Sequence, residues 1–482
     1  MRRAARLLLG LAFCVLSACG GGTAAPEWPT YRDENGFDRF LSELQVEAGP
    51  WTEEERAEYL SYLRPEEFDH PFTVDEIRGL LEHREGADSV TIARARADME
   101  LAFELLAYGY GGYTYFGGDG VFLPIRDGIL AQLEKLNGPV ETETLGRLLW
   151  EGLSPVMVDR HFHVFANGWS SAEEAPPYVQ STWYVRDLYF DDPTGIDPSY
   201  VKHTIGPDGA ITYCLAVVCP DGGALPSSMT IEGEARALEW RKAAPAGVNR
   251  VGEAAVLSET TVGAERIPVL ANRLLYAYPE RLEEFAATAA RYREEPLFIL
   301  DLRGHGGGND GWAAQWLTDF SGQPVSPKSM WCIKGTNISL AAWEEAGLDP
   351  ASYGLTDSLG GWSVSIHDGT IWETDNTVFV LIDQNVASAG ESFVSQLAMG
   401  RRVVLVGSNT MGDLNFGNVS AFYLPHSGLS LWFGASLSFR DRLENNEGVG
   451  YFPDLWVRPD DSVDAVARLC RYYGLTERES AG

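Results

Sequence analysis

The fold of this chain is decided by the stretch Thr377-Val-Phe-Val-Leu-Ile-Asp383-Gln-Asn-Val-Ala-Ser388-Ala-Gly-Glu391-Ser-Phe-Val-Ser-Gln-Leu-Ala-Met399. Its apolar start predicts a buried strand, and the polar turn after it opens a helix. Ser388 stands where that helix begins, so its hydroxyl lies near the free N–H groups of the first helical turn. A nucleophilic serine needs such a rigid and polarised place.

A structural interpretation of the same serine competes with the catalytic one. Ser388-x-x-Glu391 has the spacing of a capping box, in which the serine accepts a hydrogen bond from the third helical N–H. Glu391 would then reach back to the serine N–H. Taken alone, the stretch favours the cap, because helix caps are far commoner than nucleophiles.

A second strand–turn–helix unit, about eighty residues upstream, shifts the balance toward catalysis. Leu297-Phe-Ile-Leu-Asp301-Leu-Arg303-Gly-His-Gly-Gly-Gly308-Asn-Asp310 reads as a buried strand that ends in a glycine-rich turn. A phosphate cradle or a plain tight turn are the alternatives. The run lacks the spacing of nucleotide-binding glycine motifs and no lysine follows it, which disfavours phosphate. Bare glycine amides beside a serine instead predict an oxyanion hole.

The 482 residues suffice for two or three domains, and strands alternating with helices predict an α/β core. We divide the chain into a signal peptide (1–18), a lipidated cysteine and tether (19–35), an N-terminal helical domain (36–155), a His-bearing segment (156–183), a β-rich insert (184–245) and the α/β core (246–475).

The N-terminus predicts export to a bacterial cell envelope. A positive region ending at Arg6 and a short apolar run precede Leu16-Ser-Ala-Cys19, which resembles the lipobox of bacterial lipoproteins. The resemblance implies that Cys19 carries a lipid anchor on the periplasmic face. Gly20 lacks the acidic signal for inner-membrane retention, which favours the outer membrane. An ordinary secretory signal is the alternative, and no later segment is apolar enough to span a bilayer.

Charge and cysteine content restrict the partners. The formal net charge is −32, so the surface repels nucleic acid and anionic lipid headgroups. Four cysteines remain besides Cys14 and Cys19, and an exported protein permits disulfides. Cys214 and Cys219 are spaced to staple a hairpin, but the sequence cannot choose among three pairings. The cysteines lack zinc-finger spacing, so we predict no metal and no cofactor.

Five motifs in order give the chain a family resemblance. They are Asp159-x-His161, Leu300-Asp-Leu-Arg-Gly-x-Gly-Gly-Gly308, Asn385-Val-Ala-Ser388-Ala-Gly-Glu391, Val406-Gly-x-x-Thr410-x-Gly412 and Glu447-Gly-x-Gly-x-x-Pro-Asp454. Together they resemble the tail-specific, or C-terminal-processing, serine proteases. The resemblance spans roughly residues 95–460 and implies a crotonase- or ClpP-like ββα core that cleaves a peptide or protein substrate.

One departure selects a branch of that family. The best-known branch has a lysine base directly after Thr-x-Gly, but this chain has Asp413 there and no lysine after Lys334. The other branch resembles the tricorn core protease, which pairs its serine with a histidine and a glutamate. In that branch His161 is the base and Glu447 its acidic partner. A serine precedes the histidine there, whereas this chain has Arg160, and we recognise no PDZ domain in the insert.

The resulting hypothesis assigns a role to each motif. Ser388 is the nucleophile, His161 the general base and Glu447 the group that orients the imidazole. The N–H groups of Gly306 or Gly307 and of Ala389 stabilise the oxyanion.

Alternatives remain for two of these residues and for the function as a whole. His163 competes as the base, and Glu444 and, less well, Asp159 compete with Glu447. Asp301 and Arg303 fix the glycine turn. A non-catalytic lipoprotein that binds a peptide or an apolar ligand is the second functional hypothesis, because retinoid-binding modules share the family's fold. An acyl-CoA enzyme is disfavoured by the export signal, and the oligomeric state stays open.

Overall fold

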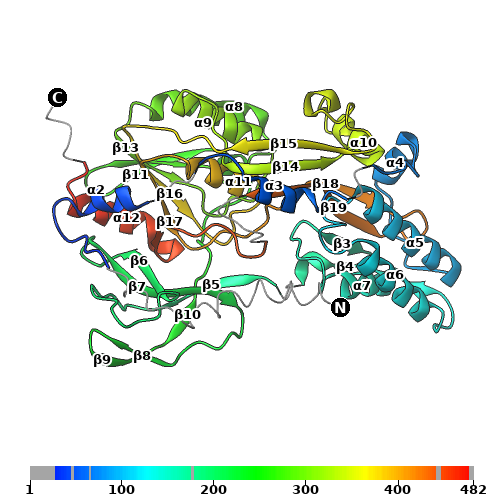
Figure 1. Ribbon diagram of the computed structural model, residues 1–482, viewed down its shortest axis with the longest axis horizontal. Helices are drawn as coiled ribbons and strands as arrows, with labels where there is room; N and C mark the ends of the chain where they lie inside the picture. The colour runs from blue at the N-terminus through cyan, green and yellow to red at the C-terminus, as the bar shows by residue number, and fades with distance from the viewer. Residues whose placement is uncertain (1–27, 45–47, 65–66, 175–177, 441–446, 477–482) are drawn as a thin grey trace.

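The central element of the computed structural model is a six-stranded sheet (Figure 1). The structure describes residues 28–44, 48–64, 67–174, 178–440 and 447–476. The strands of the sheet, in spatial order, are β11 (Ser258–Val262), β12 (Ile267–Ala271), β13 (Leu297–Asp301), β16 (Thr377–Ile382), β17 (Val403–Gly407) and β20 (Leu455–Trp456). All neighbours from β12 to β20 are parallel, and only β11 is antiparallel.

Helices cover both faces of this sheet, which explains why its inner strands are continuous apolar runs. On one face pack α8 (Pro279–Tyr292), α9 (Gly311–Ser321) and α11 (Ala389–Leu397). On the other face pack α2 (Gly36–Glu43) and α12 (Ser462–Tyr472), as Figure 1 shows. The predicted α/β class is confirmed.

A second, antiparallel sheet carries most of the N-terminal helices. Its order is β15 (Trp362–Asp368), β14 (Lys328–Lys334), β19 (Ser430–Arg440), β3 (His163–Ala166) and β4 (Trp169–Ser170), with β18 (Phe416–Tyr423) on β19. The helices beside it are α3 (Glu53–Leu60), α4 (Val74–Leu81), α5 (Ile92–Gly109), α6 (Asp119–Leu133), α7 (Thr142–Leu153) and α10 (Asn337–Glu345), and the pair β1 (Ser89–Val90) and β2 (Val140–Glu141) lies among them.

These helices do not form a core of their own. Their apolar side chains and those of β14, β18 and β19 belong to one buried cluster, so the predicted helical domain 36–155 is a layer on the second sheet. Helix α2 leaves that layer altogether, because Phe37 packs on Phe379 of the central sheet with ring centroids 5.9 Å apart.

The β-rich insert is a separate four-stranded sheet at the lower left of Figure 1. Its order is β10 (Trp240–Lys242), β5 (Gln180–Val185), β7 (Ile211–Pro220) and β6 (Val201–Ile205), and the hairpin β8 (Ser228–Ile231) and β9 (Glu234–Ala237) extends from it. The insert therefore begins a few residues before the predicted start at 184, and β5 leads into it from the His-bearing segment.

The predicted staple between Cys214 and Cys219 is wrong. Both thiols are free and both residues lie on the single strand β7. Five residues apart on an extended strand, their side chains point to opposite faces and their Cα atoms are far beyond disulfide reach. The predicted hairpin was one continuous strand.

The N-terminal features of the sequence fall outside the described residues. The signal peptide, Cys19 and Gly20 precede residue 28, so the structure does not bear on them. Among the described helices, not one combines the length and the apolar character that crossing a membrane requires.

Candidate active site

The two turns singled out in the sequence meet at the carboxyl end of β13 and β16. Asp383, which directly follows β16, accepts hydrogen bonds from Gly304 N at 2.8 Å and from Asn385 N at 3.0 Å. The Ala387 N–H donates to the carbonyl of His305 at 2.9 Å. Because these bonds join one turn to the other, the glycine run lies directly beside the start of helix α11.

Ser388 is held in an unusual backbone conformation. Its φ is +51° and its ψ −119°, a region that a residue with a side chain rarely adopts, and the local strain is typical of a functional turn. Its hydroxyl caps no N–H of α11, and Glu391 binds residues elsewhere. The capping-box interpretation is therefore wrong, because the Oγ atom faces the Nε2 atom of His161 at 3.1 Å.

His161 lies in the turn before β3 and is fixed through its backbone. Asp159 accepts the His161 N–H at 2.8 Å, and the buried hydroxyl of Tyr110 donates to the other Asp159 oxygen at 2.7 Å. Tyr178 donates to the Asp159 carbonyl at 2.8 Å. The imidazole is thereby presented to Ser388 by a rigid loop, and Asp159 acts on the main chain of His161.

The acidic partner of the imidazole is Asp413. Its Oδ1 atom lies 2.6 Å from His161 Nδ1, on the side of the ring opposite Ser388. Neither atom has another hydrogen-bond partner among the described residues. Ser388, His161 and Asp413 thus form a hydroxyl–imidazole–carboxylate chain, the arrangement that activates a serine.

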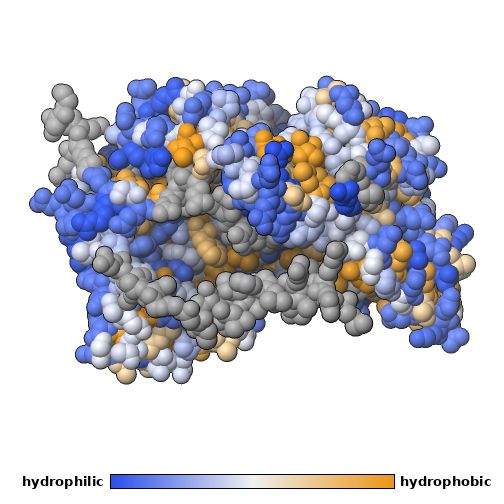
Figure 2. All heavy atoms as spheres, in the orientation of Figure 1, coloured by the Kyte–Doolittle hydropathy of each residue, from blue (hydrophilic) through white to orange (hydrophobic). Residues whose placement is uncertain are grey.

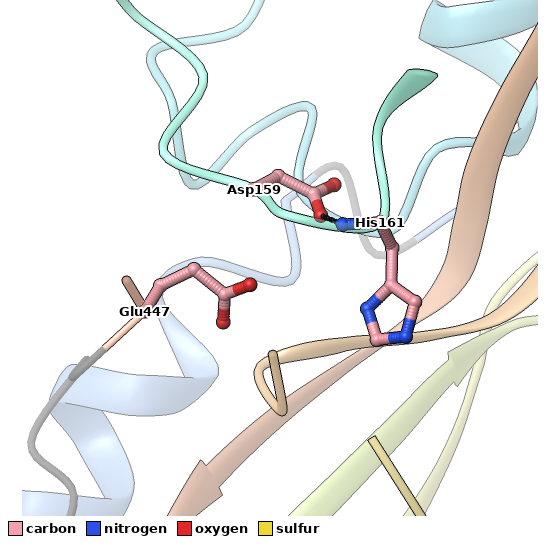
Figure 3. Close-up of side chains that lie close together, drawn as sticks. All are labelled: Asp159, His161 and Glu447. Atoms are coloured by element: carbon pink, nitrogen blue, oxygen red, sulfur yellow. Dashed lines mark hydrogen bonds between the residues drawn. The ribbon is translucent and has the colours of Figure 1, made fainter. Parts of the chain in front are cut away.

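Glu447 does not occupy the predicted place against the ring. It accepts hydrogen bonds from Arg160 N at 3.0 Å, Leu414 N at 3.3 Å and Asn415 N at 3.0 Å. In Figure 3 the dashed bond of Asp159 ends on the backbone nitrogen of His161, and the imidazole extends away from it. Glu447 therefore ties the loop of His161 to the loop of Asp413, and the expectation of direct contact is corrected.

The acidic surroundings control the charge of the site. Burial lowers the pKa of His161, but the charges of Asp413, Asp159 and Glu447 more than offset it and raise that pKa to about 9. Burial raises the pKa of Asp159 to about 6. Burial also raises the pKa of Glu447 well above its usual range, and the neighbouring charges of Asp413 and Asp159 add to this shift. At neutral pH the imidazole of the resting site is therefore mostly protonated.

The described residues contain one group of side chains that is close enough to hold a metal ion. It consists of Asp159, His161 and Glu447, whose candidate ligand atoms lie within 4.8 Å of one another. Each carboxylate oxygen, however, already accepts a hydrogen bond from an amide or from Tyr110. The imidazole nitrogens face Ser388 and Asp413. We therefore interpret the group as a charge cluster that supports the histidine.

The predicted oxyanion hole is only partly present. Gly306 N donates to the Arg273 carbonyl at 3.0 Å, and Gly307 N donates to His305 Nδ1 at 3.1 Å. The prediction of free glycine donors is wrong in this conformation, because both N–H groups already have protein acceptors. The Ala389 N–H is the first of helix α11 and has no acceptor within the helix, so it is available to an oxyanion.

From the sequence His305 could line the substrate cleft or be exposed, and the structure excludes the exposed placement because the residue is fully buried at this turn. Its ring is fully buried against the start of α11, where a side chain on Gly390 would lie 2.5 Å from Nδ1. Burial lowers the pKa of His305 to about 3, so the ring stays neutral and its Nδ1 can accept the Gly307 N–H. The predicted roles of Asp301 and Arg303 are confirmed, because their side chains form two hydrogen bonds of 2.7–2.8 Å below this turn.

Gly307 touches the nucleophile, which leads to a test. Its φ is +95°, and a methyl group there would lie 3.0 Å from Ser388 Cβ and 3.2 Å from the Ala387 carbonyl. Gly307→Ala is expected to lower kcat for peptide hydrolysis by about a hundredfold or more, because it displaces the attacking hydroxyl. Gly306→Ala is the matched control, since no atom lies within 4 Å of its added methyl. Equal activity of the two variants would contradict the placement.

The competing residues fall into different places. His163 pairs with Trp432 across β3 and β19, and its Nδ1 has no partner among the described residues. Burial lowers the pKa of His163, so the His163 ring stays neutral beside the pair of His161 and Asp413. Glu444 lies outside the described residues.

Comparison with known proteins agrees with the geometry. Residues 277–450 match the model of peptidase family S41. Over this segment the chain is therefore similar to the serine peptidases of family S41. The match covers the glycine turn, Ser388, Asp413 and Glu447, whereas His161 lies before it. No curated protein matches the chain in sequence.

Solved structures resemble the chain over most of its length. Mature CPAF is 14% identical, with a TM-score of 0.45 over 81% of this chain and 99% of that one. The photosystem II D1 C-terminal processing protease is 13% identical, with a TM-score of 0.37 over 78% and 96%. A lipoprotein from Streptococcus agalactiae is 11% identical, with a TM-score of 0.36 over 78% and 95%. At these values the likeness assigns no role to any residue.

Proposed function

We propose that this protein is a serine endopeptidase that cleaves peptides or protein tails through an acyl-enzyme, with Ser388, His161 and Asp413 as its triad. The observation that carries the proposal is the chain of contacts from hydroxyl to imidazole to carboxylate, 3.1 Å and 2.6 Å long. One member of this chain, His161, comes from outside the segment that matches the family model.

The reaction follows from these contacts. Ser388 Oγ attacks the carbonyl carbon of the scissile peptide bond while His161 Nε2 takes its proton, and His161 then gives that proton to the leaving amine. Asp413 holds the other ring nitrogen as the N–H tautomer and stabilises the imidazolium. The Ala389 N–H donates to the developing oxyanion. Water, activated by the same imidazole, hydrolyses the ester and restores the serine.

An apolar surface on this face suits the binding of an extended peptide. Figure 2 shows apolar atoms in the middle of the face, between the β-rich insert and the elements above it. An apolar surface binds side chains of an unfolded segment by removing their surface from water. The substrate class of the proposal is therefore an unstructured peptide or protein tail.

We further propose that a lipid on Cys19 tethers the protein to the periplasmic side of the outer membrane. The support is the sequence before Cys19 and the residue Gly20 after it. Fatty-acid labelling that is present in the full chain and lost in Cys19→Ser would support the anchor, and labelling that persists would refute it.

A fluorophosphonate probe tests the catalytic proposal directly. Such a probe forms a covalent bond only with a serine that a neighbouring base has activated. We expect one adduct per chain, mapped by mass spectrometry to the peptide containing Ser388, and no adduct after His161→Gln. A folded protein that takes up no probe would favour the non-catalytic binding lipoprotein instead.

A further inference from the structure

Glu391 is a buried carboxylate that the triad itself does not use. It lies in the first turn of α11, three residues after Ser388, and its exposed fraction is 0%. Burying a carboxylate is costly unless it is well bonded. The cost is offset here by several donors, all of which come from one distant loop.

These donors belong to the loop that carries Asp413. One oxygen of Glu391 accepts the Thr410 hydroxyl and the Gly412 N–H, the latter at 2.8 Å. The other oxygen accepts the N–H of Asp413 itself at 2.7 Å. The carboxylate therefore holds the main chain of the residue whose side chain faces His161.

The remaining contacts of the loop explain why this clamp matters. The Thr410 hydroxyl also accepts the Tyr451 N–H at 2.7 Å, and the Met411 N–H donates to the Val386 carbonyl at 2.9 Å. The Gly448 N–H donates to the Gly412 carbonyl at 2.7 Å, and Glu447 binds the two residues after Asp413. Glu391 is the described side chain that accepts the N–H groups of Gly412 and Asp413 themselves.

We propose that Glu391 is a positioning residue for the reaction, which holds Asp413 against His161 and thereby fixes nucleophile and acid relative to one another. The inference rests on the proposed triad. The start of helix α11 carries Ser388 and, one turn later, Glu391, which binds the loop that contains Asp413. A shift of α11 thus moves both groups together and keeps the 3.1 Å and 2.6 Å contacts of His161 matched.

The charge of Glu391 agrees with such a role. Burial raises its pKa to about 7, the neighbouring charge of Asp413 adds to this, and the bonds from Thr410, Gly412 and Asp413 counteract it. Its three described partners all donate to it, so the group acts as a hydrogen-bond acceptor. Its substitution by an amide keeps the size but places an NH2 group against N–H donors.

The test is an NMR titration of the His161 imidazole in wild type and in Glu391→Gln, which measures the ring directly and needs no substrate. We expect the pKa of His161 to fall by about one unit, because Asp413 moves away and its charge acts less strongly. The kcat for peptide hydrolysis should fall by about ten- to a hundredfold with little change in KM.

Three comparisons keep this proposal separate from the proposed function. Glu391→Asp, which retains the acceptor, should restore part of the wild-type pKa, and Glu391→Gln added to Asp413→Asn should cause no further shift. If Glu391→Gln does not fold, Thr410→Val replaces it, with a smaller shift in the same direction. A folded Glu391→Gln whose His161 pKa equals that of wild type would overturn the inference, whether or not the protein cleaves peptides.

Discussion

Replacing Ser388 by alanine is expected to lower kcat/KM for hydrolysis of an unfolded protein substrate by about 10⁵- to 10⁶-fold. Loss of the nucleophile removes the covalent route altogether, and only oxyanion stabilisation and substrate binding remain. The fold should not change, because the hydroxyl caps no helix N–H and its one described contact is with His161. Steady-state hydrolysis and the thermal unfolding midpoint measure the two effects.

Ser392 provides the matched control for this substitution. It lies four residues later on the same helix, and its hydroxyl is 3.3 Å from Asp310. Ser392→Ala should retain activity within a few-fold of wild type, since this buried hydroxyl makes a long hydrogen bond to Asp310 rather than to the triad. If Ser388→Ala retained substantial activity after purification from a protease-deficient host, another residue would have to be the nucleophile.

The sequence predicted those parts of the site that depend on local patterns. A continuous apolar run predicts an inner strand of a covered sheet, and β13 and β16 lie where those runs were. Ser388 and His161 were found by their places after a strand and in a short motif, and the structure brings the two side chains together. Local sequence patterns were therefore sufficient to predict those site residues that lie directly at the end of a strand or at the start of a helix.

The remaining contacts depend on distant segments, which no local pattern encodes. Gly306 loses its free N–H to the carbonyl of Arg273, a residue of another strand end. Glu391 has the spacing of a cap and instead binds a loop twenty residues ahead. Strands β14 and β15 went unpredicted. Strand β15 is partly exposed and lacks a continuous apolar run, and both strands form through pairing with a neighbour distant in the sequence.

Asp413 was the residue most open to prediction among those missed. In the best-known branch of the tail-specific proteases this position carries the lysine base, a signal that could have placed residue 413 near the catalytic groups. The Asp413 carboxylate lies 2.6 Å from His161 Nδ1, where it can orient the imidazole.

Asp413→Asn is accordingly expected to lower kcat by about 10⁴-fold, because an amide there no longer holds the reactive tautomer of the imidazole. It should also shift the pH profile. The base must be neutral to act, and Asp413 helps to raise the pKa of His161 to about 9. In wild type kcat/KM therefore rises with pH up to that region, and in the variant the rise moves to lower pH because burial, which lowers this pKa, is no longer offset as strongly.

Glu447→Gln discriminates between the two acidic candidates for this role. Glu447 binds the amides of Arg160, Leu414 and Asn415, so its substitution should loosen both loops but leave Asp413 on the ring. We expect a smaller loss of kcat than for Asp413→Asn and a smaller shift of the pH profile. If Glu447→Gln lowered kcat more than Asp413→Asn and also shifted the pH profile further, the orienting role would belong to Glu447. The carboxylate that neutralises the imidazolium must have the larger effect on both kcat and the pH profile.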